Sequence, residues 1–575
     1  IGLYKFDILS QRGLGKIRDT MDLIAQSDPK AAAAIDIHDM QKFKTDENIK
    51  RLLRGALAVG CFYVESPAMR MLMRKLQVDT YLGLVAASSV IRPGVARSGM
   101  MKAYIERHRD PRKRREAHSI LHALMPETYG VMVYQEDVIK VAHHYAGLDL
   151  GEADVLRRGM SGKFRSKEEF AKAKDTFVTK AMAKGHRAVE VEEVWRQVES
   201  FAGYAFAKGH SASYAVESYQ SLFLKAYWPL EYMTACINNF GGFYRTEFYV
   251  HEARTLGANI EPPCVNNGGW NAICDSRNKR LILGFNLVKG VEHTCVLQIS
   301  NERKRDGPFA SLEDCVRRVN GVGIEQFVLM IRCGGFRFAG RSKQALLWEA
   351  YFLLGHAPKK QTTTSLFVHE ARRFQLPELA SGQLENAFDE LELFGFCLEP
   401  PFHLLTPEAK ILSQCAVPSK ELSRHTRRRV EVVGHLVTVK ETATARGERM
   451  AFGCFLDEHG DWLDSVHFPP QLKRSPFRGP GIYRICGVVQ EDQGCHHVVA
   501  DHLSKLDLIP DPRYSESGAP VPASRPSNRR VMEARRQAIT AVGRTGRENH
   551  LEMNTQRNSD RNHSSAPGMR HRKPP

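Results

Sequence analysis

The chain has 575 residues, of which 42% are hydrophobic, so it has packed interiors but is too long for a single core; we expect three or four domains. Its formal net charge of +17 and pI near 9.3 favour a polyanionic partner, either nucleic acid or an acidic membrane surface. No apolar run approaches the roughly 20 residues of a membrane span, which excludes an integral membrane protein and predicts a soluble, cytoplasmic one.

The chain begins with Ile1, and its first residues have the character of a strand interior, so we expect it to be a fragment. Residues 3–9 alternate, which places Lys5 and Asp7 side by side on one face of a short strand. The pair is either a surface ion pair or an arrangement suited to a site where a metal and a phosphate meet.

Residues 13–255 have a strongly helical pattern with short loops. A turn at 91–100 carries Arg92 and Arg97, and a basic run follows at 107–115. Such a run is typical of a solvated loop, although on a basic protein it is also suited to following a phosphate backbone.

Asp149-Leu-Gly-Glu152 has the form of a capping box and predicts a helix start. The helix that follows carries Arg157 and Arg158, a pair suited to binding a triphosphate because guanidinium groups contact phosphate bidentately. A structural salt-bridge role explains the two arginines equally well.

The stretch Phe201-Ala-Gly-Tyr204-Ala-Phe-Ala-Lys208-Gly-His210 precedes a helix whose apolar face holds residues 212, 216, 219, 223 and 227 and which must end at Pro229. Lys208 and His210 therefore lie at a helix start, where unpaired backbone N–H groups attract anions. The pattern indicates either a phosphate or nucleotide site or a capped turn leading into a buried helix.

Residues 256–425 are mixed. Val288-Lys-Gly290-Val291 and Asn320-Gly-Val-Gly323 resemble the turns of helix-hairpin-helix units, which offer backbone N–H groups to DNA phosphates. A polar segment farther on contains Gln361-Thr-Thr-Thr-Ser-Leu366-Phe367, which is either a docking peptide for a hydrophobic pocket on a partner or a linker with two incidental apolar residues.

Residues 429–508 are rich in strand signals, and five segments are expected, at 430–440, 450–456, 462–468, 482–490 and 497–503. Five strands in about 80 residues suit an oligonucleotide-binding (OB) barrel or another small barrel. From Pro510 the composition predicts a disordered, arginine-rich tail. The twelve cysteines have no Cys-x-x-Cys spacing, and the closest cluster is Cys486, Cys495 and His496-His497, so we expect reduced thiols rather than a zinc site.

Taken together, these stretches resemble the alpha subunit of bacterial DNA polymerase III, a C-family DNA polymerase, or its error-prone paralogue. The resemblance covers nearly all of residues 1–508. Its motifs are Gly2-Leu-Tyr-Lys-Phe-Asp7, Phe62-Tyr-Val-Glu-Ser66, Arg92-Pro-Gly-Val-Ala-Arg-Ser-Gly99, Thr128-Tyr-Gly-Val-Met-Val-Tyr-Gln-Glu136, Leu150-Gly-Glu-Ala-Asp-Val-Leu-Arg-Arg158 and Phe201-Ala-Gly-Tyr…Lys208-Gly-His-Ser211.

The resemblance implies a multidomain α+β chain. Its expected parts are the last strand of the palm (1–12), the helical fingers (13–255), a clamp-binding region with helix-hairpin-helix units and a linker (256–425), an OB-fold (426–508) and a disordered basic tail (509–575). The implied activity is template-directed DNA synthesis with two Mg²⁺ ions. The implied partners are primer–template DNA, deoxynucleoside triphosphates, the sliding clamp and other replisome subunits, with no membrane.

The resemblance also assigns roles to residues. Asp7 is the expected catalytic, metal-binding carboxylate, and Lys5 faces the triphosphate. Arg157, Arg158, Tyr204, Lys208 and His210 are the other expected nucleotide contacts, with Arg92 and Arg97 as further candidates. The expected clamp-binding residues are Gln361, Leu366 and Phe367.

Two departures from the family pattern matter. Ala207 and Gly209 stand where the family usually has Asn and Ser, so polar contacts are not expected there. The family's other two catalytic carboxylates form an Asp-x-Asp pair, and no Asp-x-Asp occurs in this chain, so the chain alone is expected to be inactive. A non-catalytic module that binds DNA and the sliding clamp is the alternative function.

Overall fold

The structure is a computed structural model that describes residues 12–91, 99–159, 167–201, 207–355, 382–444 and 446–514. The chain divides into two compact units, residues 1–509 and 510–575, and the fold described below is that of the first. Lys5, Asp7, Arg92, Arg97, Tyr204, the 361–367 peptide and most of the basic tail lie outside the described residues. No helix in the described part is both long enough and apolar enough to cross a bilayer.

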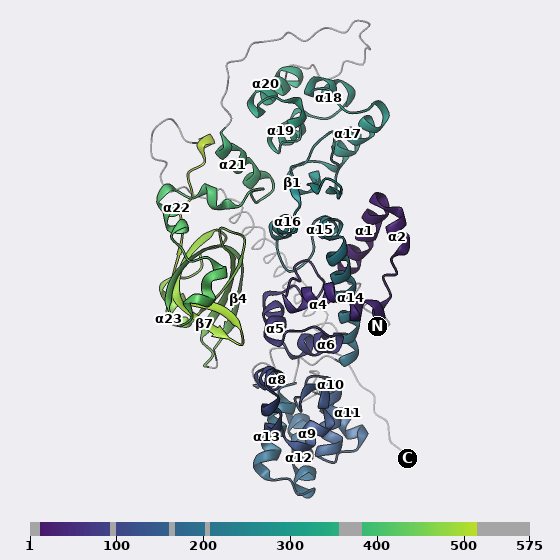
Figure 1. The fold of residues 1–575 in the computed structure, drawn as a ribbon, viewed down its shortest axis with the longest axis vertical. Helices are drawn as coiled ribbons and strands as arrows, with labels where there is room; N and C mark the ends of the chain where they lie inside the picture. Colours follow the sequence, from purple (N-terminus) through teal and green to yellow (C-terminus); the bar gives the residue numbers. More distant parts are fainter. Residues whose placement is uncertain are drawn as a thin grey trace, which may run out of the picture. The chain divides into compact units, whose positions relative to one another are not determined.

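The described residues from 12 to 255 are helical, as the sequence predicts (Figure 1). The α-helices are α1 Arg12–Ser27, α2 Pro29–Ala34, α3 Met40–Thr45, α4 Glu47–Arg54, α5 Pro67–Leu76, α6 Tyr81–Val90, α8 Met100–Arg109, α9 Ser119–Leu124, α10 Gln135–Lys140, α11 Leu150–Arg158, α12 Lys167–Ala183, α13 Ala188–Glu199, α14 Lys208–Tyr227, α15 Pro229–Asn238 and α16 Thr246–Thr255. Two 3₁₀ turns, Pro111–Glu116 and Pro126–Thr128, and a π-helical turn, Val141–Tyr145, connect some of them.

Helix α14 is the centre of this region and contacts α1, α3, α4, α6 and α15 (Figure 1). The helix starts at Lys208 and stops before Pro229, as predicted. The prediction that Tyr227 belongs to the buried apolar face of α14 is wrong, because Tyr227 is 44% exposed. The polar Glu217 and Lys225 are buried instead. Because neighbouring helices cover α14 on several sides, its polar residues also enter the core.

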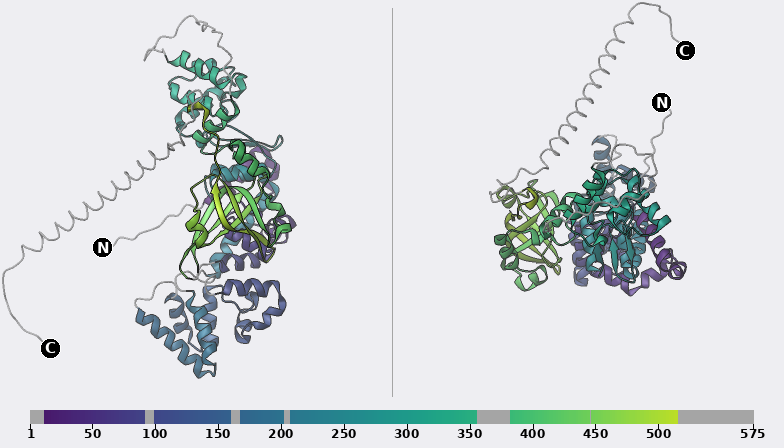
Figure 2. Two further views of the ribbon diagram at one scale, coloured as in Figure 1. Left: turned by 90° about the vertical axis from the view of Figure 1, so that its left-hand side faces the viewer. Right: turned by 90° about the horizontal axis from the view of Figure 1, so that it is seen from above.

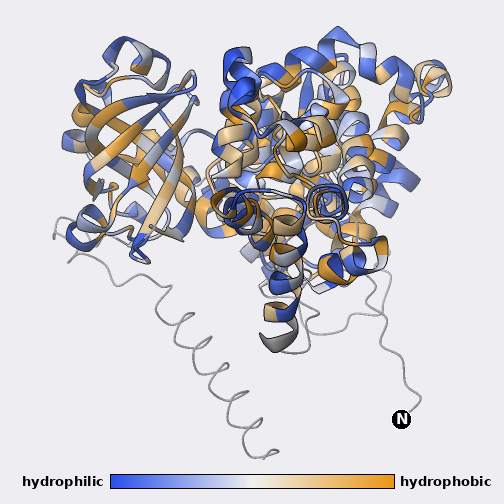
Figure 3. Cartoon of the chain, turned by 90° about the horizontal axis from the view of Figure 1, so that it is seen from below, coloured by the Kyte–Doolittle hydropathy of each residue, from blue (hydrophilic) through white to orange (hydrophobic). Residues whose placement is uncertain are grey.

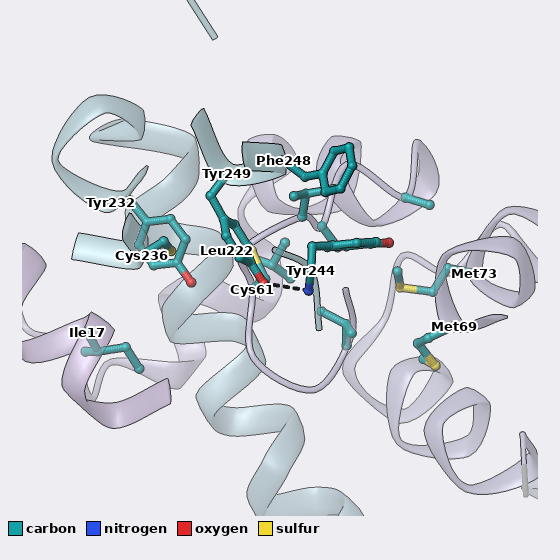
Figure 4. Close-up of a cluster of buried hydrophobic side chains, with 14 of the residues drawn as sticks. Ile17, Cys61, Met69, Met73, Leu222, Tyr232, Cys236, Tyr244, Phe248 and Tyr249 are labelled. Carbon is teal, nitrogen blue, oxygen red and sulfur yellow. Dashed lines mark hydrogen bonds between the residues drawn. The ribbon is translucent and has the colours of Figure 1, made fainter. Parts of the chain in front are cut away.

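The core around α14 is aromatic and sulfur-rich (Figure 4). Cys61, Leu222, Tyr232 and Cys236 are completely buried there, and the backbone N–H of Tyr244 donates to the Tyr249 hydroxyl at 3.2 Å. Helices α1 and α14 approach closely at Gly13, where an added Cβ would lie 2.1 Å from Glu217 Oε1. This site requires glycine for space rather than for backbone conformation.

The next region combines a small sheet with helices. Strands β1 Asn259–Glu261, β3 Arg280–Ile282 and β2 Ile273–Asp275 pair in that order, with β1 parallel to β3 and β2 antiparallel to it. The helices that follow are α17 His293–Asp306, α18 Leu312–Arg318, α19 Ile324–Arg332, α20 Lys343–Leu354, α21 Gln383–Leu393 and α22 Pro407–Gln414. Short 3₁₀ helices lie at Phe285–Leu287, Arg337–Ala339, Pro401–Leu404 and Ser419–His425.

The two predicted hairpins have matching backbones. Val288 and Val291 in the first, and Val319 and Val322 in the second, are buried, while the glycine between each pair has φ of +84° or +85°. Gln326 of α19 links the two units by donating to the Gly290 carbonyl at 3.0 Å and accepting from the Glu292 N–H at 2.9 Å. The two exposed turns therefore belong to two packed copies of a helix-hairpin-helix unit.

Residues 429–505 form a closed five-stranded barrel, which confirms the predicted strands (Figure 2). The strands are β4 Arg429–Ala443, β5 Arg449–Leu456, β6 Trp462–His467, β7 Ile482–Asp492 and β8 Cys495–Lys505. Their order is β4-β5-β6-β8-β7, closed by β4 against β7, with β6 and β8 parallel. Helix α23 Pro469–Arg474 joins β6 to β7. Apolar side chains of the barrel strands pack together in one buried cluster, and hydrophobic stretches run along these strands (Figure 3). This is the topology of an OB-fold.

One buried carboxylate should make stability depend on pH. Glu217 is 7% exposed, and its Oε1 has no hydrogen-bond partner in the described part of the chain. Burial raises the pKa of Glu217 from 4.5 to about 7, although Lys16 opposes the shift. Because the folded-state pKa lies above the unfolded value, the free energy of unfolding falls as the pH rises from about 4.5 to about 7.

We therefore expect Glu217→Gln to raise the free energy of unfolding by about 2 kcal/mol at pH 8 and to change it little at pH 4.5. Thermal melts of the variant and the unaltered chain at both pH values measure the difference. A Tm difference that is the same at both pH values would contradict this role for Glu217.

Candidate functional site

Two basic helix ends form the candidate site, and the first is the carboxyl end of α11. The predicted capping box is present at the other end of this helix: the Asp149 N–H donates to Glu152 at 2.9 Å and the Glu152 N–H donates to Asp149 at 2.8 Å. Arg157 Nε donates to Asp154 Oδ1 at 2.9 Å, and Arg158 Nε lies 3.0 Å from Asp154 Oδ2. One carboxylate thus pairs with two guanidinium groups.

The second basic end is the start of α14, where Lys208 is the first residue, as the sequence predicts. Its backbone N–H donates to both oxygens of Glu136, at 3.0 and 2.9 Å. Its Nζ donates to Glu127 Oε2 at 2.6 Å and lies 5.3 Å from the centre of the Tyr134 ring. The helix start therefore holds an anion in this structure, and the anion is a carboxylate of the same chain.

Residues 134–136 join the two ends. Gln135 and Glu136 open α10; the Gln135 side chain accepts from Arg157 Nη1 at 3.2 Å, while Glu136 accepts from Lys208. Asp137 fixes this turn by accepting from the N–H groups of Val133 and Tyr134, both at 2.9 Å, and burial raises the pKa of the Asp137 carboxyl. Tyr134, Gln135 and Glu136 together thus contact both basic ends: Gln135 contacts Arg157, and the other two contact Lys208.

The cationic side chains of this site pair with carboxylates that are partly exposed to solvent: Asp154 is 41% exposed and Glu127 is 54% exposed. The side chains of Arg157 and Arg158 are 27% and 58% exposed, and that of Lys208 is 39% exposed. Because such exposed pairs contribute little stability, a phosphate group with more negative charge is able to replace the carboxylates. The arrangement is suited to exchanging carboxylate contacts for phosphate contacts.

The remaining expected residues differ in their placement. His210 is exposed in the first turn of α14. Ser211, beside it, is buried and its hydroxyl accepts from Ser89 Oγ at 2.7 Å, so it faces the core. Space around Gly209 is open, with no atom within 4 Å of an added Cβ. Residues 134–136 thus link α11, which carries Arg157 and Arg158, to α14, which carries Lys208 and His210. Lys5, Asp7 and Tyr204 lie outside the described residues.

The sequence reasoning missed the acidic and amide partners Glu127, Gln135, Glu136 and Asp154. A partial signal existed, because Gln135 and Glu136 end one of the motifs that carried the family resemblance. Nothing in their local pattern, however, relates them to a lysine 72 residues away.

A metal centre is not found in this part of the molecule. No group of three His, Cys, Asp or Glu side chains among the described residues is placed to hold a metal ion, including the Cys486, Cys495 and His496-His497 cluster. The described donor set therefore does not fit the expected Mg²⁺ ions, and Asp7 lies outside it.

Comparison with known families supports this architecture. Residues 13–185 match the bacterial DNA polymerase III alpha subunit finger domain, and residues 257–346 match a helix-hairpin-helix motif. The end of α11 lies within the residues that match the finger domain, and the start of α14 at Lys208 lies after them. The class of protein that the chain resembles is thus a bacterial DNA polymerase with fingers, helix-hairpin-helix units and an OB barrel.

Within that class, the chain is similar to DNA polymerase III subunit alpha, as the motifs predict. The subunit of Treponema pallidum is 28% identical over 96% of this chain and 47% of its own length, and that of Escherichia coli K12 is 28% identical over 82% and 42%. The error-prone DNA polymerase of Corynebacterium glutamicum is 29% identical over 88% and 46%. The chain spans less than half the length of these relatives.

Proposed function

We propose that this chain takes part in template-directed DNA synthesis and that the site at 134–136, Arg157–Arg158 and Lys208 binds the triphosphate of the incoming deoxynucleotide. The observation that carries the proposal is the convergence of two basic helix ends on one segment, with an anion already seated on the α14 amide. Helix starts and arginine pairs are the groups that phosphates favour. His210 and Tyr204 are proposed to contact the sugar and base, and Lys5 the phosphates.

Asp7 is the proposed catalytic carboxylate and the one Mg²⁺ ligand of this chain. The proposed substrates are primer–template DNA and deoxynucleoside triphosphates. The proposed domain boundaries are those expected from the sequence, with the fingers at 13–255, the clamp-binding region at 256–425 and the OB barrel at 426–508.

Primer extension tests this function. Because the 575-residue chain alone is expected to be inactive, the assay uses the complete polypeptide that the gene encodes. With a labelled primer–template and Mg²⁺, the proposal expects addition of the nucleotide complementary to the template base and little addition of the other three. Binding of primer–template without any nucleotide incorporation would contradict it and would favour the alternative, a module that binds DNA and the sliding clamp. The two hairpin turns, in which residues 289–290 and 320–321 are exposed, favour that second function, since such turns are suited to phosphate contact without base reading.

The sliding clamp is the proposed partner of the peptide at 361–367. Replacing Leu366 and Phe367 with alanine is expected to weaken binding to the clamp at least tenfold, because two apolar anchors leave its pocket, and to spare synthesis without the clamp. Surface plasmon resonance with immobilised clamp measures this, and Thr362→Ala with Thr363→Ala in the same segment is the matched control. Equal affinity of the two double variants would remove the peptide from the proposal.

A further inference from the structure

Three aromatic side chains form a cluster beside α14 that the description of the nucleotide site has not used. Phe62 and Tyr63 lie in the segment between α4 and α5, and Tyr214 lies in the second turn of α14. The ring centres of Tyr63 and Tyr214 are 4.9 Å apart, and Phe62 meets the Tyr214 ring edge-on at 5.5 Å. All three side chains are partly exposed, so the cluster presents ring surface outside the core.

The backbone on the α4–α5 side of the cluster is held in an uncommon conformation. Tyr63 has φ of +67°, a left-handed value that is rare for a bulky residue. Its hydroxyl donates to the Ser88 carbonyl at 3.4 Å, and the Phe62 carbonyl accepts from Ser218 Oγ at 3.0 Å. Behind the cluster, a Cβ added at Gly13 would lie 2.6 Å from the Phe62 ring. Contacts with three helices therefore fix the two rings in front of α14.

An open face of α14 leads from the proposed triphosphate site to this cluster. His210 and Ser213 are exposed, and no atom lies within 4 Å of a Cβ added at Gly209. Tyr214 follows His210 by four residues, so both lie on the same side of the helix. At a rise of about 1.5 Å per residue, Tyr214 is about 9 Å farther along α14 than Lys208.

This separation suits the two ends of one nucleotide. The deoxyribose holds the base away from the phosphates, so a nucleotide with its phosphates at the start of α14 carries its base along the helix. Aromatic rings stack on any of the four bases, because every base has a π face, and such stacking does not read the sequence. The cluster is thus suited to supporting a base whose identity is determined by the template.

We propose that Tyr214 and Tyr63 form the surface on which the base of the incoming deoxynucleotide packs, with Phe62 holding the Tyr214 ring in place. This inference rests on the proposed function and deepens it. It adds an aromatic base contact to a site that the described residues define only through phosphate contacts.

Single-nucleotide incorporation by the complete polypeptide that the gene encodes tests the inference. Rapid quench on primer–template DNA with Mg²⁺ separates nucleotide affinity from the maximal rate. Tyr214→Ala is expected to weaken the affinity for each of the four complementary deoxynucleotides about tenfold, because a base–aromatic stack is lost. Tyr214→Phe keeps the ring and is expected to bind nearly as well as the unaltered polypeptide. The matched control is Tyr227→Ala, at the other end of the same helix and 44% exposed, which is expected to leave the affinity unchanged.

A deoxyribose triphosphate that carries no base separates base contact from a disturbed fold. Its affinity, measured by competition with the complementary nucleotide, is expected to be the same for Tyr214→Ala and for the unaltered polypeptide, because only phosphate and sugar contacts remain. Tyr63→Gly removes the second ring, and glycine adopts a φ of +67° readily. This variant is expected to weaken nucleotide binding in the same direction and to leave the binding of the baseless triphosphate unchanged.

Four results would each overturn the assignment of Tyr214. They are an unchanged nucleotide affinity in Tyr214→Ala, an equal loss with the baseless triphosphate, an equal loss in Tyr227→Ala, and a loss in Tyr214→Phe as large as in Tyr214→Ala. An unchanged affinity in Tyr63→Gly would remove Tyr63 from the surface. If the unaltered polypeptide incorporates no nucleotide, the proposed function itself fails; if it incorporates nucleotides and Tyr214→Ala binds them equally well, only this inference fails.

Discussion

Replacing Arg157 and Lys208 with glutamine together is expected to lower the affinity for the incoming deoxynucleoside triphosphate about a thousandfold. Each charge-assisted hydrogen bond to phosphate contributes about 1.5–3 kcal/mol, and one cation is lost from each of the two helix ends. Nucleotide affinity is measured by stopped-flow single-nucleotide incorporation with the full encoded polypeptide on primer–template DNA. DNA affinity is expected to change much less.

The matched control is Arg187→Gln with Lys174→Gln, which removes the same two charge types from surface ion pairs on α12 and α13. Glu136→Gln is expected to act in the opposite direction and to raise triphosphate affinity about fivefold, because it removes the negative charge seated on the α14 start. If Glu136→Gln weakens binding and the Arg157, Lys208 variant matches the control, the carboxylates are structural and do not occupy phosphate positions.

Lys225→Met is expected to destabilise the core around α14 by about 3–5 kcal/mol. Lys225 Nζ is buried and donates to Glu252 at 2.7 Å and to the carbonyls of Leu57 and Val59 at 3.0 and 2.8 Å. Removing the ammonium leaves a buried carboxylate, the buried Val59 carbonyl and the part-buried Leu57 carbonyl without this partner, and breaking one side of such a pair has a cost of this size. Native-state hydrogen exchange at the amides of α14 measures the loss as a local opening free energy.

Lys50→Met is the control for this prediction, because Lys50 and Glu47 are also 2.7 Å apart but Glu47 is 72% exposed. An exposed pair contributes about 0–1 kcal/mol, so this variant should change little. Adding Glu252→Gln to Lys225→Met is expected to recover part of the lost stability, since the uncompensated charge is then absent. Equal effects of Lys225→Met and Lys50→Met would contradict the role of the buried pair.

The barrel and the helix boundaries could be predicted because local patterns determine them. Alternation of buried and exposed residues marks the strands, and Gly447, Gly460 and Gly494 lie with positive φ in the turns that divide them. Pro229 could likewise be used to place the end of α14. The burial of Lys225 and the exposure of Tyr227 could not, because periodicity identifies one apolar face and does not show how many neighbours surround a helix.

The cationic half of the candidate site was also predictable, since arginine pairs and a lysine at a helix start have a recognisable local form. Its acidic half was not, because Glu136 and Lys208 are 72 residues apart and Gln135 and Arg157 are 22 residues apart.

Photolabelling with a deoxynucleoside triphosphate that carries an aryl azide on its γ-phosphate tests most directly whether the helix ends of α11 and α14 form one triphosphate site. The full encoded polypeptide is irradiated on primer–template DNA, and the labelled peptides are mapped by mass spectrometry. We expect label in the peptides that contain Glu136, Arg157 or Lys208, and loss of that label when unmodified complementary nucleotide is added. Competable label confined to the hairpins at 288–291 and 319–322 or to the barrel would contradict the assignment.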